Sequence, residues 1–385
     1  MGLMKIGLIC PYNIAKGGGV QEIVRAMHKE LVERGHQVRI LTPEPREITD
    51  SHRTKDMIFV GSAADFKSPL HTTSQFSVTA DIYGIEQMLD EEQFDILHFH
   101  EPWVPMLSRQ ILGRSRSVNI ATFHAKLPET MMSRTVVKVV TPYTKAVLRN
   151  LDELTAVSDA AAEYVRTLTD APVAIIPNGI DLSVYKTAKH AKSVDKKLKS
   201  ILFIGRLERR KGVNCLLEAY GLLSDKMPDV ELIIAGDGPD REKLEFAARE
   251  MELPNVKFLG YVTEQEKLDL LASADLFCAP ALYGESFGIV LLEAMASGLV
   301  TVAGNNPGYT SVMQDFGSLS LVKPTDSAEF ASRMDVMLNN GDVRKLWQKW
   351  AKDYVQQFSY TTIVDQYEAV YKAAHKKHAT IAEPA

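Results

Sequence analysis

Short apolar runs rich in valine and isoleucine alternate along the whole chain with segments whose apolar residues recur at helical spacing. Strands that each lead into a helix are typical of parallel sheets built from strand–helix–strand units. The clearest helix of the first half is predicted at Val20–Arg34. The runs in this half predict strands at Lys5–Cys10, Gln37–Leu41, Ile96–His100, Asn119–Phe123, Glu153–Val157 and Val173–Ile176.

The same alternation begins again after Lys186–Lys199, a polar, lysine-rich segment that is typical of a linker. Strands are predicted at Ser200–Ile204, Val230–Ala235, Val256–Leu259, Asp275–Cys278, Val300–Ala303 and Ser318–Val322. Helices are predicted at Val213–Leu223, Arg241–Glu250, Glu264–Ala272, Phe287–Ala296 and Ala328–Asn339. The pattern therefore predicts two doubly wound α/β domains, 1–185 and 186–357, with a last helix, 358–378, packing back on the first.

A chain of 385 residues is long enough for two hydrophobic cores, which agrees with this division. Ligands of doubly wound domains bind beyond the carboxyl ends of the strands, so two such domains in tandem favour a site shared across a cleft. The three cysteines are widely spaced in apolar stretches, which indicates buried thiols in a reducing compartment. Without an apolar run long enough for a signal sequence or a membrane span, we expect a cytoplasmic protein.

The charge pattern bears on possible partners. The net charge of −5 and the lack of a recognisable motif argue against nucleic acid. Between Pro102 and Leu151, however, eight Lys or Arg residues stand against a single acid, Glu129. Two interpretations stay open: residues 109–149 face an anionic membrane surface, or they are ordinary solvated charges.

The first predicted strand leads into Gly17, Gly18 and Gly19 and then into a helix. Glycines at a helix start let the backbone approach a ligand, and the unpaired N–H groups there favour a phosphate or a developing anion. The spacing differs from G-x-G-x-x-G, which argues against the usual dinucleotide motif. A purely structural turn is the alternative.

Two basic side chains follow the first strand of the second half, in Gly205-Arg206-Leu207-Glu208-Arg209-Arg210-Lys211-Gly212. From the carboxyl end of a strand, Arg206 and Lys211 can together neutralise a diphosphate and stabilise it as a leaving group. Ordinary surface solvation is the alternative for both.

Two glutamates flank a predicted helix start in Gly284-Glu285-Ser286-Phe287-Gly288-Ile289 and, further on, Glu293. Carboxylates bind vicinal hydroxyls, and helix N-terminal amides bind phosphates, so this segment suits a sugar nucleotide. The backbone of Ser286, Phe287, Gly288 and Ile289 would then contact the nucleotide. The alternative is that Glu285 interacts only with the helix dipole and that Glu293 belongs to a buried salt bridge.

His124 ends the predicted strand Asn119–Phe123, at the edge where a ligand is expected. A neutral imidazole there can bond a sugar hydroxyl or a phosphate, although a structural role is the alternative. His98 and His100 share a strand face, but spacing supplies no third ligand. We therefore predict no metal site from these residues. A divalent metal requirement stays open, although no motif indicates one.

Taken in order, these segments resemble the retaining family 4 glycosyltransferases of the GT-B fold over nearly the whole chain. The resemblance rests on Gly17-Gly18-Gly19-Val20, Ile176-Pro177-Asn178-Gly179-Ile180-Asp181, Gly205-Arg206 with Lys211-Gly212, Ala235-Gly236-Asp237-Gly238, and Glu285 with Glu293. Further segments are most similar to the lipid mannosyltransferases of that family: Ile9-Cys10-Pro11-Tyr12, Asp95–Pro102, Ala121–His124 and Gly284–Leu291.

The resemblance implies a hexosyltransferase that moves mannose from GDP-mannose onto a lipid such as phosphatidylinositol, at the inner face of the membrane. Glu285 would contact the sugar, Glu293 the ribose, and Arg206 and Lys211 the diphosphate. His124 would bind sugar or phosphate, with Gly18 and Gly19 beside the reacting centre.

The chain departs from this pattern at Asp81–Asp95, where the lipid mannosyltransferases carry a strongly basic helix and this sequence is acidic. Membrane attraction would then rest on residues 109–149. Three other activities stay open: transfer from a UDP-sugar to another lipid or glycan, epimerisation of a sugar nucleotide, and hydride transfer, the last disfavoured by the glycine spacing.

Overall fold

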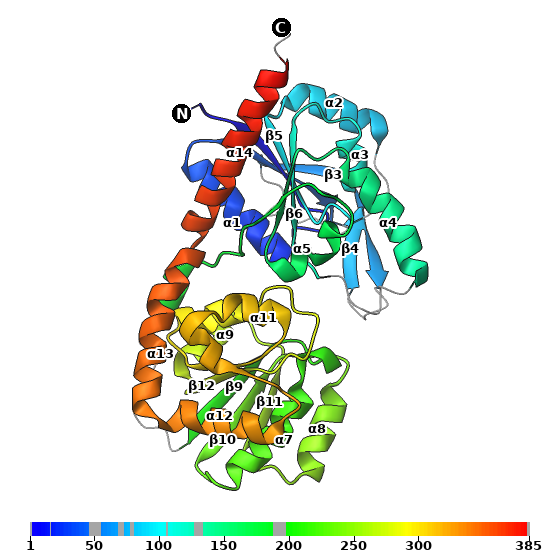
Figure 1. The fold of residues 1–385 in the computed structure, drawn as a ribbon. Coiled ribbons are helices and arrows are strands. Elements are labelled where there is room, and N and C mark those ends of the chain that lie inside the picture. The colour runs from blue at the N-terminus through cyan, green and yellow to red at the C-terminus, as the bar shows by residue number, and fades with distance from the viewer. Residues whose placement is uncertain are drawn as a thin grey trace. The chain divides into compact units, whose positions relative to one another are not determined.

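The computed structural model describes residues 2–15, 17–45, 55–67, 73–77, 81–104, 107–126, 134–187 and 198–382. The chain forms two compact units (Figure 1). Unit 1 consists of Met1–Asn178 and Tyr360–Ala385, and unit 2 consists of Gly179–Ser359. Each unit is built around one sheet and has its own core, as the alternation of strands and helices predicts.

Unit 1 contains an eight-stranded sheet in the order β4-β3-β2-β1-β5-β6-β7-β8. Its strands are β1 Lys5–Ile9, β2 Gln37–Glu44, β3 Met57–Lys67, β4 Thr73–Ser77, β5 Ile96–His100, β6 Val118–Phe123, β7 Glu153–Ala156 and β8 Val173–Ile175. Its helices are α1 Gly19–Glu33, α2 Ile82–Glu92, α3 Leu107–Leu112, α4 Arg134–Leu148, α5 Asp159–Arg166 and α14 Tyr360–Ala382. Neighbouring strands are parallel except β3 and β4, an antiparallel pair at the sheet edge that the apolar runs did not predict.

Unit 2 contains a six-stranded parallel sheet in the order β11-β10-β9-β12-β13-β14. Its strands are β9 Lys199–Ile204, β10 Val230–Ala235, β11 Val256–Gly260, β12 Leu276–Ala279, β13 Thr301–Gly304 and β14 Leu321–Val322. Its helices are α6 Leu182–Thr187, α7 Val213–Ser224, α8 Arg241–Glu250, α9 Glu264–Ser273, α10 Ile289–Ala296, α11 Pro307–Val312, α12 Ser327–Asn339 and α13 Gly341–Tyr354. Most of the strand predicted at Ser318–Val322 is instead a 3-10 helix, η5 Asp315–Ser320.

Both sheets are doubly wound, which confirms the predicted fold class. In unit 1 the chain runs from β1 outward to β4 and then returns to β5 on the other side of β1. In unit 2 it runs from β9 outward to β11 and returns to β12 beside β9. The loops that follow β1 and β5, and those that follow β9 and β12, therefore lie at the switch points where such sheets bind ligands.

The boundary between the units falls after Asn178, earlier than the expected boundary at residue 185. The backbone N–H of Ile180 donates to the Phe358 carbonyl at 2.8 Å, and Ile180 forms an isolated bridge with Ser359. These bonds join the first and last residues of unit 2, so α6 belongs to that unit. Most of the expected linker, residues 188–197, lies outside the described residues.

Helix α14 returns to unit 1 and lies along α1 (Figure 1). Glu368 on α14 accepts bonds from Arg34 Nη1 at 2.7 Å and bonds the His36 ring at 2.8 Å. The rings of Tyr367 and Tyr371 are fully buried against the sheet. Aromatic burial and a partly buried ion pair thus attach the C-terminal helix to a unit formed mainly by the N-terminal half.

We expect Glu368→Gln to weaken this attachment. Burial raises the pKa of Glu368, but the bonds from His36, Arg34 and Lys372 outweigh it and bring the pKa down to about 2. A depressed carboxyl pKa stabilises the fold above the unfolded value near 4.5, and this contribution is lost as pH falls toward 2. Because solvent screens part of the interaction, the loss at neutral pH should be about 1 kcal/mol. Urea unfolding at pH 7 and pH 3 checks this: the difference from wild type must shrink at the lower pH.

Candidate functional site

Two loops of unit 2 meet at the switch point between β9 and β12. The first loop carries Arg206 and Lys211, and the second carries Glu285. At Gly212, φ is +68° and a Cβ would lie 2.1 Å from the Pro280 carbonyl oxygen, so the two backbones touch. The residues predicted to bind the diphosphate and the sugar are thus brought together. Where the two loops cross, at Gly212 and Pro280, there is no room for a side chain.

A chain of ion pairs connects these side chains. Glu285 Oε1 lies 2.6 Å from Arg210 Nη1 and 2.8 Å from Lys211 Nζ. Glu208 links the other side, with Oε2 2.8 Å from Arg210 Nε and Oε1 3.1 Å from Arg206 Nε. We call Arg206, Glu208, Arg210, Lys211 and Glu285 the charge cluster. Sequence reasoning missed Glu208 and Arg210, although both stand in the same basic loop.

The charges of the cluster favour an anionic ligand. Burial raises the pKa of Glu285, but Lys211 and Arg210 outweigh it, so the pKa lies below the ordinary value and the carboxyl is ionised. Three cations then stand against two carboxylates, and the cluster keeps one positive charge in excess. An incoming diphosphate could take over the bonds that Lys211 and Arg210 now donate to Glu285.

Helix α10 begins beside Glu285, two residues later than predicted, because Gly288 at φ +107° is its N-cap. No side chain caps this end, and the first-turn N–H groups of a helix lack intrahelical partners. Phe287 is buried, and its ring packs edge-on against Phe358 with centroids 6.0 Å apart. Its side chain therefore anchors the loop, while the backbone of Ser286, Gly288 and Ile289 lies at the helix start.

Glu293 lies within α10 and is buried. It accepts hydrogen bonds from Lys267 Nζ at 2.8 Å and from the Tyr185 hydroxyl at 3.1 Å. The carboxylate of Glu264 also pairs with Lys267 at 2.8 Å. Glu293 thus occupies a buried salt bridge, the alternative left open by the sequence, and its partners Lys267 and Tyr185 had no sequence signal.

In unit 1 the glycine turn follows β1. Gly18 is the N-cap of α1 in an extended conformation, and Gly19 is the first helical residue. A Cβ at Gly18 would lie 2.5 Å from Gln21 Oε1, so this glutamine side chain folds over the turn. Among the described residues, no hydrogen bond joins this turn to His124.

His124 follows β6 and is buried, with its Nε2 2.9 Å from His100 Nδ1. Its neighbour His98 bonds the Tyr371 hydroxyl at 2.6 Å and the Thr122 hydroxyl at 2.7 Å. Both ring nitrogens of His98 are therefore engaged in the core. The described part of the chain contains no group of three His, Cys, Asp or Glu residues placed to hold a metal.

The three histidines are neutral. Burial lowers the pKa of His98 to about 3 and that of His124 to about 4, and it holds the pKa of His100 well below its usual value. Coulombic repulsion between the rings adds to the effect on His98 and His100. The histidines at this end of the unit 1 sheet are therefore polar but uncharged, unlike the side chains of the charge cluster in unit 2.

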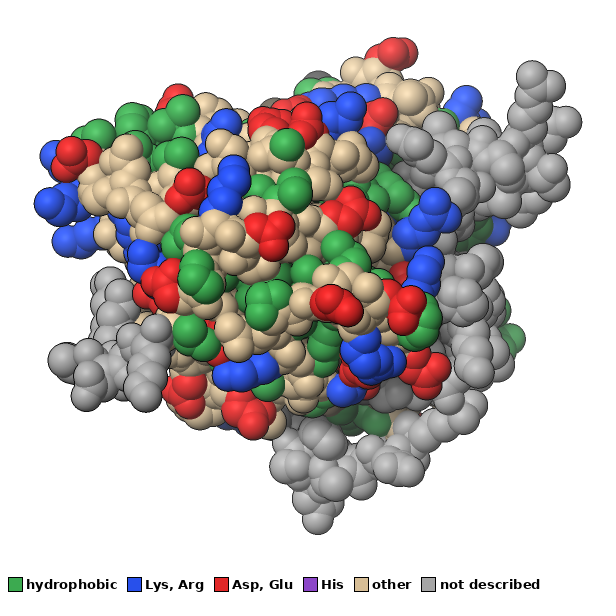
Figure 2. All heavy atoms as spheres, turned by 90° about the horizontal axis from the view of Figure 1, so that it is seen from below, with side chains coloured by type: hydrophobic (Ala, Val, Ile, Leu, Met, Phe, Trp, Pro, Cys, Tyr) green, Lys and Arg blue, Asp and Glu red, His purple; other side chains and the backbone are tan. Residues whose placement is uncertain are grey.

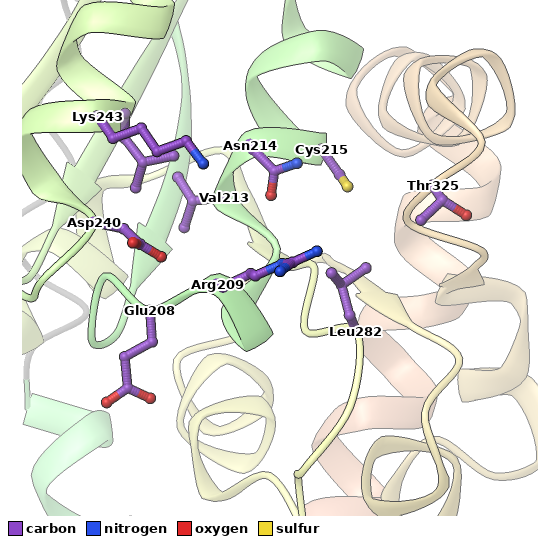
Figure 3. A pocket seen from close by; sticks show the side chains of 10 residues that line it. Glu208, Arg209, Val213, Asn214, Cys215, Asp240, Lys243, Leu282 and Thr325 are labelled. Atoms are coloured by element: carbon purple, nitrogen blue, oxygen red, sulfur yellow. The ribbon is translucent and has the colours of Figure 1, made fainter. Parts of the chain in front are cut away.

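A pocket of about 520 Å³ lies in unit 2 between the loop after β9, the starts of α7 and α8, and the loops that carry Leu282 and Thr325 (Figure 3). Arg209, Asn214, Cys215 and Lys243 line it. Glu208 is also at its border, with the carboxylate turned away from the other labelled side chains. None of Arg206, Lys211, Glu285 and Glu293 lines this pocket, but it borders the charge cluster through Glu208, which pairs with Arg206.

The basic stretch 109–149 is partly neutralised within unit 1. Arg114 Nε lies 3.0 Å from Glu86 on the acidic α2, and Lys126 pairs with Glu163 at 3.0 Å. Arg109 lies over the Tyr143 ring. Of the described helices, none has the length and apolar character that crossing a membrane requires. Figure 2 shows one face of the molecule, seen from below the view of Figure 1, on which acidic and basic side chains are interspersed.

Two family models match the chain in succession: "Glycosyltransferase Family 4" over residues 17–184 and "Glycosyl transferases group 1" over residues 185–354. A phosphatidyl-myo-inositol mannosyltransferase of Mycobacterium leprae is 31% identical over 378 residues and 96% of both chains. The enzyme of that name from Propionibacterium freudenreichii is 30% identical, covering 98% of this chain and 97% of its own.

Solved structures agree on the fold. A glycosyltransferase from Rickettsia africae has a TM-score of 0.75 at 17% identity and covers 97% of this chain and 99% of its own. Anabaena HepE, solved with UDP and glucose, has a TM-score of 0.74 at 18% identity and covers 96% of this chain and 100% of its own. The matched models, the identities and the two doubly wound units place this chain in the GT-B glycosyltransferases of family 4, as a hexosyltransferase.

Proposed function

We propose that this enzyme transfers mannose from GDP-mannose to a lipid such as phosphatidylinositol, with retention of configuration, at the cytoplasmic face of the membrane. The relatives named phosphatidyl-myo-inositol mannosyltransferase cover nearly all of this chain and support this choice of substrates. The observation that carries the proposal is the charge cluster: a partly buried, ionised Glu285 held by two cations beside the uncapped start of α10.

In this proposal, unit 2 holds the donor. Arg206 and Lys211 bind the diphosphate, aided by Arg210 and the backbone of Ser286, Phe287, Gly288 and Ile289 at the start of α10. As the sugar–phosphate bond breaks, negative charge grows on the leaving phosphate, and fixed cations stabilise that charge without rearranging. Lys267 shares its charge with Glu293, so a ribose hydroxyl would displace part of this salt bridge. No step in this scheme requires a bound metal or a covalently held cofactor.

Once Lys211 and Arg210 turn to the diphosphate, Glu285 is released to accept bonds from sugar hydroxyls. A single carboxylate then serves two states: it orders the cations before the donor binds and the sugar afterwards. Its depressed pKa keeps it ionised throughout the neutral range.

Unit 1 would supply the acceptor side through Gly18, Gly19 and His124. The neutral imidazole of His124 can bond an uncharged hydroxyl without the cost of desolvating an ion. The acceptor lipid would draw the enzyme to an anionic membrane surface through the basic side chains of residues 109–149. Of these, Lys145 and Arg149 have no ion pair among the described residues.

Purified protein incubated with GDP-mannose and phosphatidylinositol vesicles, followed by mass spectrometry of the lipids, tests the proposal. We expect a lipid product heavier by one hexose. Free mannose alone, or no consumption of GDP-mannose, would contradict it.

A UDP-sugar is the second candidate donor, because HepE, a structural neighbour, was solved with UDP-glucose. The same vesicles with UDP-glucose in place of GDP-mannose distinguish the two donors. Sugar nucleotide converted in the absence of vesicles, with no lipid product, would instead indicate an epimerase.

A further inference from the structure

We propose that Glu101 and His100 are positioning residues for His124, one fixing its backbone and the other its ring. The inference rests on the proposed role of His124 as a ligand of the acceptor side. Glu101 and His100 stand at the end of β5, and His124 stands at the end of the neighbouring β6. All three are buried at this edge of the unit 1 sheet.

Glu101 holds the backbone that carries His124. Its Oε1 accepts hydrogen bonds from the backbone N–H of His124 at 2.5 Å and of Ala125 at 2.6 Å. The chain leaves β6 at this point, so these two N–H groups have passed beyond the sheet ladder. A buried backbone donor requires a partner, and one oxygen of the Glu101 carboxyl group serves both. The direction in which the chain leaves β6 is therefore fixed by Glu101.

The backbone of Glu101 is itself constrained. Its φ is +52°, in the left-handed region that non-glycine residues rarely adopt, and its N–H donates to the Thr122 carbonyl at 2.9 Å. A glycine would adopt this conformation without strain. A glutamate in this place indicates that the side chain matters more than the ease of the turn, and strained residues of this kind cluster at functional sites.

His100 orients the imidazole. Its Nδ1 lies 2.9 Å from His124 Nε2, and the two rings are nearly parallel, at 23°. In a bond between two neutral imidazoles one nitrogen must donate and the other accept, so His100 selects the tautomer of His124. His124 Nδ1 has no hydrogen-bond partner among the described residues, and Asn178 interacts with the ring. Nδ1, which is buried here beside Asn178, is the ring nitrogen that His100 leaves for a substrate hydroxyl or phosphate oxygen.

The surroundings keep this arrangement uncharged. Burial raises the pKa of Glu101 to about 8, although the bonds from His124, Ala125 and Trp103 act to lower it. With both imidazoles neutral, the arrangement orients His124 without placing a fixed charge beside the acceptor. This environment suits an uncharged hydroxyl nucleophile.

The test compares Glu101→Gly with Glu101→Gln in the full chain. The glycine relieves the backbone strain and removes the clamp, by which we mean the two hydrogen bonds from the backbone N–H groups of His124 and Ala125 to Glu101 Oε1. Glutamine keeps an acceptor oxygen for both N–H groups. We expect kcat to fall roughly tenfold in Glu101→Gly, since small misplacements of a reacting group slow turnover strongly. The KM for GDP-mannose should stay within about twofold of wild type, because the donor residues lie in unit 2. Glu101→Gln should recover most of the kcat.

Glu252→Gly is the matched control. Glu252 also has a positive φ, +51°, and lies exposed in unit 2, so its replacement relieves a similar strain away from the site. It should leave kcat unchanged. Wild-type kcat in Glu101→Gly would overturn the proposal. So would a loss of kcat in step with lost GDP binding and a lower Tm, which is the outcome of a purely structural role.

Imidazole nitrogen NMR of His124 keeps this test independent of the proposed function. We expect the His124 signals to move in Glu101→Gly, and in His100→Phe we expect the balance of tautomers to change. If wild type transfers no sugar, the proposed function fails while these shifts still show the clamp. Unchanged His124 signals in both variants would overturn the clamp even in an active enzyme.

Discussion

Replacing Glu285 by glutamine should lower kcat with GDP-mannose by about 10²–10³-fold, the size of effect found when one group that stabilises a transition state is removed. The amide keeps the shape of the side chain but not its charge. It cannot order Arg210 and Lys211, which the carboxylate now holds at 2.6 and 2.8 Å. It is also a poorer acceptor for sugar hydroxyls. We expect Arg206→Ala to cause a loss of similar size.

Stability should change as well, because the variant leaves two partly buried cations facing each other. We expect the free energy of unfolding to fall by about 1–3 kcal/mol. The lowered pKa of Glu285 means that its contribution is present above the unfolded carboxyl pKa and is lost as pH falls. The stability gap between wild type and variant should therefore close in acid.

Steady-state kinetics with GDP-mannose and phosphatidylinositol vesicles, beside urea unfolding, measures both effects. Glu245→Gln is the control, since Glu245 pairs with Arg241 at 2.8 Å elsewhere in unit 2. That variant should keep wild-type kcat. If Glu285→Gln turned over as fast as wild type, Glu285 would not contact the transferred sugar.

The strands and helices of unit 2 were predictable because their apolar residues recur at the spacing that buries one face of each element. β10 matches its apolar run, Val230–Ala235, and α8 matches its helical period, Arg241–Glu250. Prediction failed where strand pairing or a single backbone angle, and not apolar periodicity, determines the structure. Thr73–Ser77 has a single large apolar residue and becomes an edge strand only because β3 lies beside it. Gly288, with positive φ, delays the start of α10.

For the site, the sequence indicated which loops matter but not which atoms meet. Arg209 and Arg210 are adjacent and identical in type, yet Arg210 bonds Glu285 while Arg209 lines the neighbouring pocket. Periodicity carries no information about that choice, because it depends on the turn of η4 Arg209–Lys211. Glu101 was equally invisible as a site residue, since its role follows from a backbone angle and from two N–H groups on the neighbouring strand.

Replacing Gly212 by alanine should have the second large effect on stability and turnover, because Gly212 lies where the two loops of the charge cluster cross. At φ +68° the added Cβ would be strained, and it would lie 2.1 Å from the Pro280 carbonyl oxygen and 3.3 Å from Leu282 Cγ. Backbone cannot yield as a flexible side chain can, so the loop of Lys211 must move away from the loop of Glu285. We expect about 2–4 kcal/mol of lost stability, from left-handed strain and overpacking together.

Turnover should fall about 10²-fold, because the cations that we propose to neutralise the leaving diphosphate would no longer be aligned. Gly341→Ala is the matched control: Gly341 opens α13, and a Cβ there meets nothing within 4 Å. Alanine should favour that helix, so this variant should keep its activity and melt no lower than wild type. A Gly212→Ala enzyme with normal GDP affinity and kcat would show that the crossing of the two loops does not set the position of Lys211. If the prediction holds, that crossing aligns the charge cluster through backbone contact, and its arrangement depends on an absent side chain as much as on the charges themselves.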